Sequence, residues 1–170
     1  MHTKLYAMNI QEHLLQDGAA HGMCEKFQKE WGNPSVKELC EKYFAGQDFC
    51  IEHNWPSLDW LQENMAGKTA AYGIFINQEA ELISSPDERE MALLGDSNVT
   101  YEAYDMCDIT VRHNSTLNLK AHHRSFVYVS LHDNATLNIV SRDNSARICV
   151  SHFGGEINNK ELIDRYHKKG

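Results

Sequence analysis

Five histidines lie in or next to the corners of a repeat in the second half of the chain, where imidazole side chains could bind a metal ion or take up protons. Imidazole nitrogens are good ligands for zinc and nickel, so a column of them along one edge of a repeat would make a metal site. Apart from Glu156, which lies four residues after His152, no Asp, Glu or Cys accompanies them at a helical i, i+4 spacing. We therefore predict solvent-facing turn residues, with no metal and no cofactor, and keep a histidine-edge metal site as an alternative. The five are His113, His122, His123, His132 and His152.

Motifs of catalysis are missing from the sequence. It has no G-x-S-x-G, no P-loop, no G-x-G-x-x-G and no H-E-x-x-H. Glycoside hydrolysis needs paired carboxylates, whereas the outward positions of the expected strands carry mostly Thr, Asn, Lys and Ser. We expect a protein that is not an enzyme.

Two aromatic residues, Phe126 and Tyr128, fall on outward positions of a strand that is otherwise polar on that side. Exposed aromatic side chains are typical of contact surfaces. Together with nearby basic residues they could contact a protein, or hold RNA by stacking and phosphate contacts. The alternative is that the helical segment, the C-terminal tail or a second subunit covers them. The basic candidates are Arg112, Lys120, Arg124, Arg142 and Arg147.

These side chains lie in a sequence repeat with a period of about ten residues, which must fold into the structure that positions them. Each unit reads small-x-apolar-x-apolar-x-apolar, and the match improves at every second unit, where 114–119 (NSTLNL) recurs as 134–139 (NATLNI). A fixed period of this kind marks repetitive β architecture. The units start at Asp105, Ser115, Ser125 and Ala135.

Apolar residues occupy odd positions from Val99 to Ile139 and even positions at Ala146, Ile148 and Val150. A slip of one residue would turn a strand inside out, so we predict one inserted residue near 142–145. The better match at twice the period favours a β-solenoid of roughly 20-residue coils, in which Leu117 stacks on Leu137 and Asn118 on Asn138. An antiparallel β-meander is the alternative. Tight hairpins usually need glycine, and none lies between Gly95 and Gly154.

The first third of the chain has helical patterning. Residues 9–12 and 35–38 have the cap-x-x-Glu form, and apolar residues follow each at helical spacing. We expect helices over 9–33, 35–46 and 56–67. The fold class is therefore α+β, with a helical cap over residues 1–70 and a β-solenoid with a C-terminal tail over 71–170. The open end of a solenoid needs a cap.

Composition is ordinary for a soluble globular protein of 170 residues. The five cysteines are widely spaced and form no C-x-x-C pair, so we expect buried, inert thiols. No stretch is apolar enough to cross a bilayer or act as a signal peptide, which predicts a cytoplasmic protein with no membrane contact. Residues 1–105 carry 7 basic and 18 acidic side chains, net −11, whereas residues 106–170 carry net +3.

The stretch 35–61 (SVKELCEKYFAGQDFCIEHNWPSLDWL), Leu94-Gly95-Asp96 and repeats such as Asp133-Asn134-Ala135 resemble those of a group of small bacterial and phage-borne proteins. Members of that group pair a helical segment with a β-solenoid. The resemblance implies no catalytic residues. The group's occurrence in mobile elements suggests a role in conflict between phage and host. Together with the small size, the acidic helical segment and the lack of catalytic motifs, it leads us to expect a non-catalytic inhibitor of a host defence protein, with anti-CRISPR-like action on a nuclease.

The expected partner is therefore a protein, such as a nucleic-acid enzyme or its ribonucleoprotein, and a homodimer is possible. The alternative functions are a self-assembling solenoid and a histidine-edge metal protein.

Overall fold

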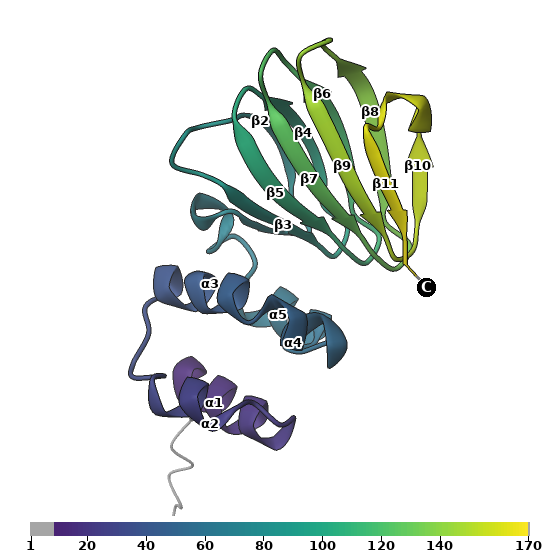
Figure 1. The fold of residues 1–170 in the computed structure, drawn as a ribbon. Helices are drawn as coiled ribbons and strands as arrows, with labels where there is room; N and C mark the ends of the chain where they lie inside the picture. The colour runs from purple at the N-terminus through teal and green to yellow at the C-terminus, as the bar shows by residue number, and fades with distance from the viewer. Residues whose placement is uncertain (1–8, 170) are drawn as a thin grey trace, which may run out of the picture. The chain divides into compact units, whose positions relative to one another are not determined.

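A computed structural model describes residues 9–169 of the chain. The described residues divide into two compact units, 9–64 and 65–169. The first is helical, and the second is built almost wholly of strands (Figure 1). Within the described residues, no helix is long and apolar enough to span a membrane.

The helical unit contains more helices than the sequence pattern predicts. Its first two helices are separated at Gly22, whose φ of +97° does not continue a helix, so the predicted single helix over 9–33 is wrong. The helix predicted over 35–46 is confirmed with its Ser35 capping box. A further short helix follows Gly46 directly. The helices are α1 (Ile10–Ala20), α2 (Glu25–Lys29), α3 (Val36–Ala45), α4 (Gln47–Glu52) and α5 (Leu58–Asn64).

Aromatic side chains form much of the core of the helical unit. Trp31 and Trp55 are buried. The Trp55 indole Nε1–H donates to Asp17 Oδ2 at 2.7 Å, and its ring lies edge-on to Phe49 with centroids 5.7 Å apart. A buried indole N–H needs such a partner, so this bond ties α1 to the segment after α4.

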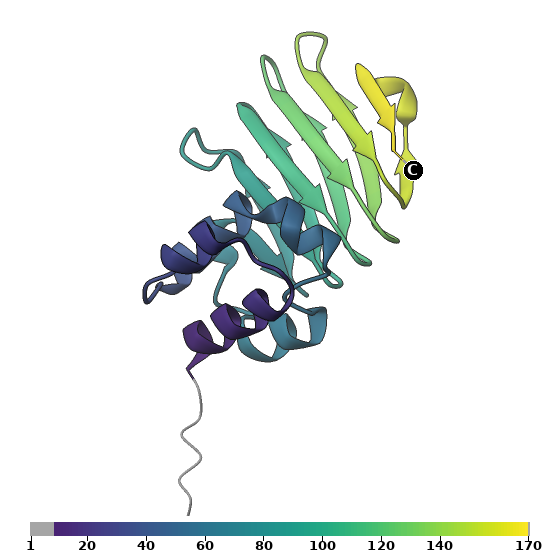
Figure 2. The ribbon, with the colours of Figure 1, turned by 60° about the horizontal axis from the view of Figure 1, so that its bottom comes forward.

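The second unit is a parallel β-solenoid, so the antiparallel meander is wrong. A short helix η1 (Ala70–Tyr72) precedes eleven strands in two sheets, and every recorded strand pair is parallel. The chain alternates between the sheets, and successive coils stack along the unit (Figure 2). Sheet A is β1 (Ile74–Ile76), β3 (Glu90–Leu94), β5 (Met106–Val111), β7 (Phe126–Leu131), β9 (Arg147–His152) and β11 (Arg165–Lys168). Sheet B is β2 (Glu79–Ile83), β4 (Asn98–Ala103), β6 (Thr116–Ala121), β8 (Thr136–Arg142) and β10 (Glu156–Asn158).

Stacked apolar side chains fill the space between the sheets. Leu117 pairs with Leu137 in register, as the repeat predicts, and both are fully buried. The predicted change of parity also occurs, but its place differs. The extra residue is Val140, a bulge within β8 where the register passes from Ile139 to Ser141, and not a residue of the turn at 142–145. The side chain of Val140 is exposed as a result.

An asparagine ladder runs across the outer face of sheet B. The Asn118 side-chain NH₂ donates to Asn98 Oδ1 at 2.9 Å, and that of Asn138 donates to Asn118 Oδ1 at 2.9 Å. Asn158 extends the ladder to Asn138 at 2.5 Å. The predicted stacking of Asn118 on Asn138 is confirmed, and the ladder joins four successive coils.

The C-terminal tail completes the last coil. After β10, the helix η2 (Lys160–Leu162) leads into β11, which pairs with β9. The side chains of Ile157, Leu162 and Ile163 pack against the solenoid core. Asp164 accepts the Ile148 N–H through Oδ2 at 2.9 Å. The tail therefore belongs to the solenoid and covers apolar surface at its end.

Candidate binding surface at the corners of the solenoid

The five histidines lie along two different edges of the solenoid, because the chain changes sheet every half coil. His113, His132 and His152 lie where β5, β7 and β9 end, and we call this edge the first corner. The turn after β6 carries His122 and His123, and we call the edge formed by the turns after β2, β4, β6 and β8 the second corner. Three of the five histidines therefore share one edge, and the other two lie on the opposite edge.

The first corner is built of residues with left-handed backbone. Asn77, Gly95, His113 and Asp133 occupy equivalent places in successive coils, and all have positive φ. Asn77 Oδ1 accepts the Asp96 N–H at 2.9 Å. His113 Nδ1 accepts the Gly95 N–H at 3.0 Å, and Asp133 Oδ2 accepts the His113 N–H at 2.9 Å. The side chains thus satisfy backbone donors of the preceding or following coil.

Burial disfavours the charged form of two first-corner histidines, His113 and His132. Desolvation, reinforced by the charge of Arg112 and opposed by that of Asp133, lowers the pKa of both His113 and His132. Because His113 Nδ1 accepts a hydrogen bond, the ring carries its proton on Nε2. The ring of His132 is stacked on Phe153, with centroids 4.4 Å apart and an interplanar angle of 9°. These rings are packing elements of the coil stack.

For two residues, Arg112 and His132, the predicted solvent-facing position is wrong. Arg112 is only 4% exposed and His132 only 8%, although both were expected at the solvent-facing turns. The register explains their burial. Arg112 lies between Leu94 and His132 in neighbouring coils, so the stack covers it. Arg112 is therefore removed from the surface candidates.

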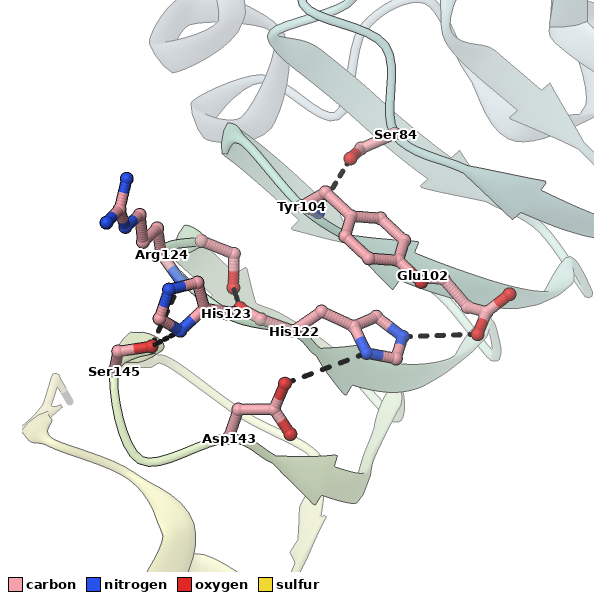
Figure 3. A network of polar contacts seen from close by, with 9 residues as sticks. Ser84, Glu102, Tyr104, His122, His123, Arg124, Asp143 and Ser145 are labelled. Carbon is pink, nitrogen blue, oxygen red and sulfur yellow. Dashed lines mark hydrogen bonds and ion pairs between the residues drawn. The ribbon is translucent and has the colours of Figure 1, made fainter.

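The second corner holds a network around His122, which we call the His122 network (Figure 3). His122 Nε2 lies 3.1 Å from Glu102 Oε1, and Nδ1 lies 3.9 Å from Asp143 Oδ2. The Tyr104 ring lies flat on the imidazole, with centroids 4.3 Å apart and an interplanar angle of 7°. Three consecutive coils thus hold the imidazole in one orientation.

Beside this network, His123 and Ser145 lie at the rim of a shallow depression lined by His123, Arg142, Asp143, Asn144 and Ser145. The Ser145 Oγ is hydrogen-bonded to His123 Nδ1 and accepts the Arg124 N–H at 3.3 Å (Figure 3). The depression is open to solvent and holds one carboxylate, so a paired-carboxylate mechanism has no second group there. Its polar groups bond to one another across two neighbouring turns.

Most of the predicted site residues lie at or beside the second corner. Phe126 is 46% exposed and begins β7, while Arg124 and Arg147 are also exposed. Lys120 is half-buried near the end of β6. Arg142 is directed inward, since Nη1 donates to Ala146 O at 3.1 Å and lies 3.6 Å from Asp164 Oδ1.

Tyr128 protrudes less than its position predicted. Its hydroxyl is hydrogen-bonded to Ser151 Oγ at 2.7 Å, and its side chain is half-buried. The strand register places Cys149 opposite it, and the side chain of Cys149 is buried. Tyr128 therefore ties β7 to β9 on the outer face of sheet A.

Two exposed residues beside these candidates were missed from the sequence. Tyr104 is 47% and Met106 57% exposed. Tyr104 meets His122 because β4 and β6 pair with Ala103 opposite Ala121, a shorter step along the chain than the repeat of the sequence. An alignment of the coils at that shorter step could have paired them. Met106 lies opposite Phe126, at the same spacing as the repeat.

Metal and thiol chemistry find little support in the described structure. Within residues 9–169, no three His, Cys, Asp or Glu side chains lie together as ligands would. Cys24 is exposed, and the other four cysteines are buried. Burial, assisted by the charge of Glu41, raises the pKa of the Cys40 thiol to about 11. Burial likewise raises the pKa of the Cys107 thiol to about 11. Such thiols are poor nucleophiles near neutral pH.

These features define a class: a parallel β-solenoid of two sheets, preceded by a helical unit, with a packed interior and its exposed functional groups at the turns and outer faces. No protein-family model, no curated protein and no solved structure matches the chain. Function must therefore be inferred from the surface of the solenoid itself.

Proposed function

We propose that this protein is a non-catalytic binding protein that contacts a partner protein through the second corner. The observation that carries the proposal is the exposed Tyr104 ring stacked on His122. Tyrosine and arginine are enriched among the residues that dominate binding energy, and Arg124 lies in the same turn as His122. The hydrogen bonds and the stack hold the Tyr104 and His122 side chains in place before a partner arrives, which reduces the entropy cost of binding.

The sharper form of the proposal names the partner as a nucleic-acid enzyme, such as a nuclease or its ribonucleoprotein. The protein would inhibit it stoichiometrically, in the manner of an anti-CRISPR product of a phage or mobile element. The excess of acidic residues in 1–105, net −11, offers a basic groove of such an enzyme an acidic surface in addition to the contact at the second corner. The resemblance to small phage-borne proteins supports the biological setting.

The experiment compares partner capture by tagged wild-type protein and by second-corner variants. Tyr104→Ala and Arg124→Glu should lose most of the captured partner, whereas Tyr104→Phe, which keeps the stack, should retain it. Thr136→Ala on the outer face of sheet B is the matched control. The unfolding temperature of each variant shows that a loss of binding is not a loss of fold.

Equal capture by wild type and Tyr104→Ala would contradict the second corner as the contact surface. If the captured protein is a nuclease, purified components should show inhibition that saturates at a fixed molar ratio. A partner that handles no nucleic acid would contradict the sharper form alone.

A second candidate function, self-assembly, is favoured by a different observation. The outer face of sheet A carries exposed Met106 and Phe126 side by side, between groups of opposite charge. That surface is distinct from the His122 network.

A further inference from the structure

The outer face of sheet A carries an apolar pair where its two middle strands, β5 and β7, begin. Met106 and Phe126 pair in register on β5 and β7, which lie side by side in Figure 1. The residues that follow them, Cys107 and Val127, belong to the interior, so both side chains point outward. Exposed apolar side chains that touch across two strands are typical of surfaces that another protein covers. This pair lies at the N-terminal end of the two middle strands of the face.

Charge changes sign from one side of this face to the other. Glu90 on β3 and Asp108 on β5 are exposed Cα partners, and both are acidic. Arg147 on β9 and Arg165 on β11 are exposed and basic. The face is therefore negative on the β3 side and positive on the β11 side, with the apolar pair between them.

One row of residues makes the arrangement symmetric about β7. Along this continuous row of Cα partners, Glu90 pairs with Asp108, Asp108 with Tyr128, Tyr128 with Cys149, and Cys149 with Arg165. Glu90 and Arg165 thus lie at the same height, two strands to either side of Tyr128. At about 4.8 Å between strands, each is roughly 10 Å from β7.

We infer that this face binds a second copy of the chain, as a face-to-face dimer about a twofold axis that runs along β7. Such an axis exchanges the two sides of the sheet and keeps the strand direction. Glu90 then faces Arg165 of the partner subunit, and Arg165 faces the partner's Glu90. Phe126 and Tyr128 meet their own counterparts on the axis. The same patch serves both copies, as an isologous interface requires.

The charges select this axis over the other one available. A twofold axis that crosses the strands would place β3 over β3 and β11 over β11, so that like charges face each other. Like charges in contact across an interface are unfavourable. Aligned packing of two sheets at about 10 Å also brings side chains as long as Glu and Arg within reach of each other.

The dimer should dissociate on dilution. Five strands at about 4.8 Å and six residues at about 3.3 Å give a face of roughly 20 by 20 Å. That area lies below the approximately 800 Å² per partner of standard stable interfaces. Concentration-dependent association is therefore the expected behaviour.

Sedimentation equilibrium over a wide concentration range tests the inference with charge reversals. Glu90→Arg and Arg165→Glu should each weaken the dimer at least tenfold, and the double variant should restore most of the wild-type affinity. Glu81→Arg, an equal reversal at an exposed position on the outer face of sheet B, should leave the dimer unchanged. Restoration by the double variant cannot come from general damage to the fold.

A monomer at every concentration would overturn the inference, and so would a dimer that survives both single reversals. A double variant no tighter than the singles would also overturn it. The partner-capture experiment uses Tyr104 and Arg124 at the second corner, so the two proposals can fail independently. A different protein found on Phe126, in place of the second copy, would likewise overturn it.

Discussion

Gly155 passes so close to Ala135 in the preceding coil that a β-carbon on Gly155 would lie 2.0 Å from the Ala135 carbonyl oxygen. The φ of Gly155 is +82°, in the left-handed region. Both constraints arise from the stacking of one coil turn on the next. The first corner therefore excludes a side chain at this position for two separate reasons.

Gly155→Ala should destabilise the solenoid strongly, and Gly67→Ala isolates the cause. Gly67 also has positive φ, +77°, but a β-carbon there would meet nothing within 4 Å. Gly67→Ala should cost about 1–2 kcal/mol, from backbone strain alone. Gly155→Ala should cost clearly more, because backbone atoms must also move. Urea unfolding of both variants measures the difference, and equal losses would contradict the close approach.

The stability of the fold should fall as the pH drops below about 6.5, the ordinary pKa of histidine. Burial lowers the pKa of His113 and His132 in the folded state. The unfolded chain therefore binds protons more readily than the folded chain in this range, so the free energy of unfolding decreases as the pH falls. The contribution is fully present above pH of about 6.5 and is lost toward the folded pKa.

His113→Asn should reduce this pH dependence. Asparagine tolerates the left-handed backbone and can accept the Gly95 N–H, as Asn77 accepts that of Asp96 in an earlier coil. Thermal unfolding at several pH values should show a shallower slope for this variant. Asn77→Gly, which removes an equivalent first-corner hydrogen bond without changing a titratable group, is the control and should keep the wild-type slope. An unchanged slope in His113→Asn would contradict the assignment.

Each asparagine of the ladder should stabilise the fold in proportion to the number of side-chain hydrogen bonds that it makes within the ladder. Asn118→Ala removes amide contacts to both Asn98 and Asn138, and leaves neighbouring amides without these partners. A cost of about 1–3 kcal/mol is expected. Asn158→Ala removes only the last bond and should cost about half as much. Chemical denaturation gives both values, and a larger loss at Asn158 would contradict a ladder in which stabilisation follows the number of bonds.

One thiol of five should react rapidly in the folded protein. Cys24 is exposed, whereas the other four cysteines are buried. The thiols of Cys40 and Cys107 also have a pKa of about 11, which makes them poor nucleophiles. Titration with a chromogenic disulfide near neutral pH should give one fast equivalent, and unfolding should release the rest. Cys24→Ser should abolish the fast phase. A fast phase that persists would identify an opening of the core.

The local pattern of apolar and polar residues was sufficient to predict the coil and the side chains of its interior. Alternation of side chains with a period of two places Leu117 and Leu137 inward and Asn118 and Asn138 outward, and the repeat stacks them. The same reasoning detected the change of parity near 140, although it placed the extra residue in the turn rather than at Val140. It also predicted the Ser35 capping box, because a helix N-terminus is specified by residues within one turn of each other.

Which side chains meet on the outer surfaces, by contrast, depends on the lengths of many successive coils and turns. Tyr104 meets His122 because the coil that leads from β4 to β6 is short. The coils that follow it are longer, so a single repeat length does not predict this contact. Burial of Arg112 requires neighbours from two other coils. The opposition of Glu90 and Arg165 across β7 requires five strands in one register. By itself the sequence determined whether each strand side chain from Val99 to Ile139 faces the interior or the outside, since that depends on adjacent residues. Only the tertiary structure decided which side chains meet, because each coil's length shifts every later coil relative to those before it.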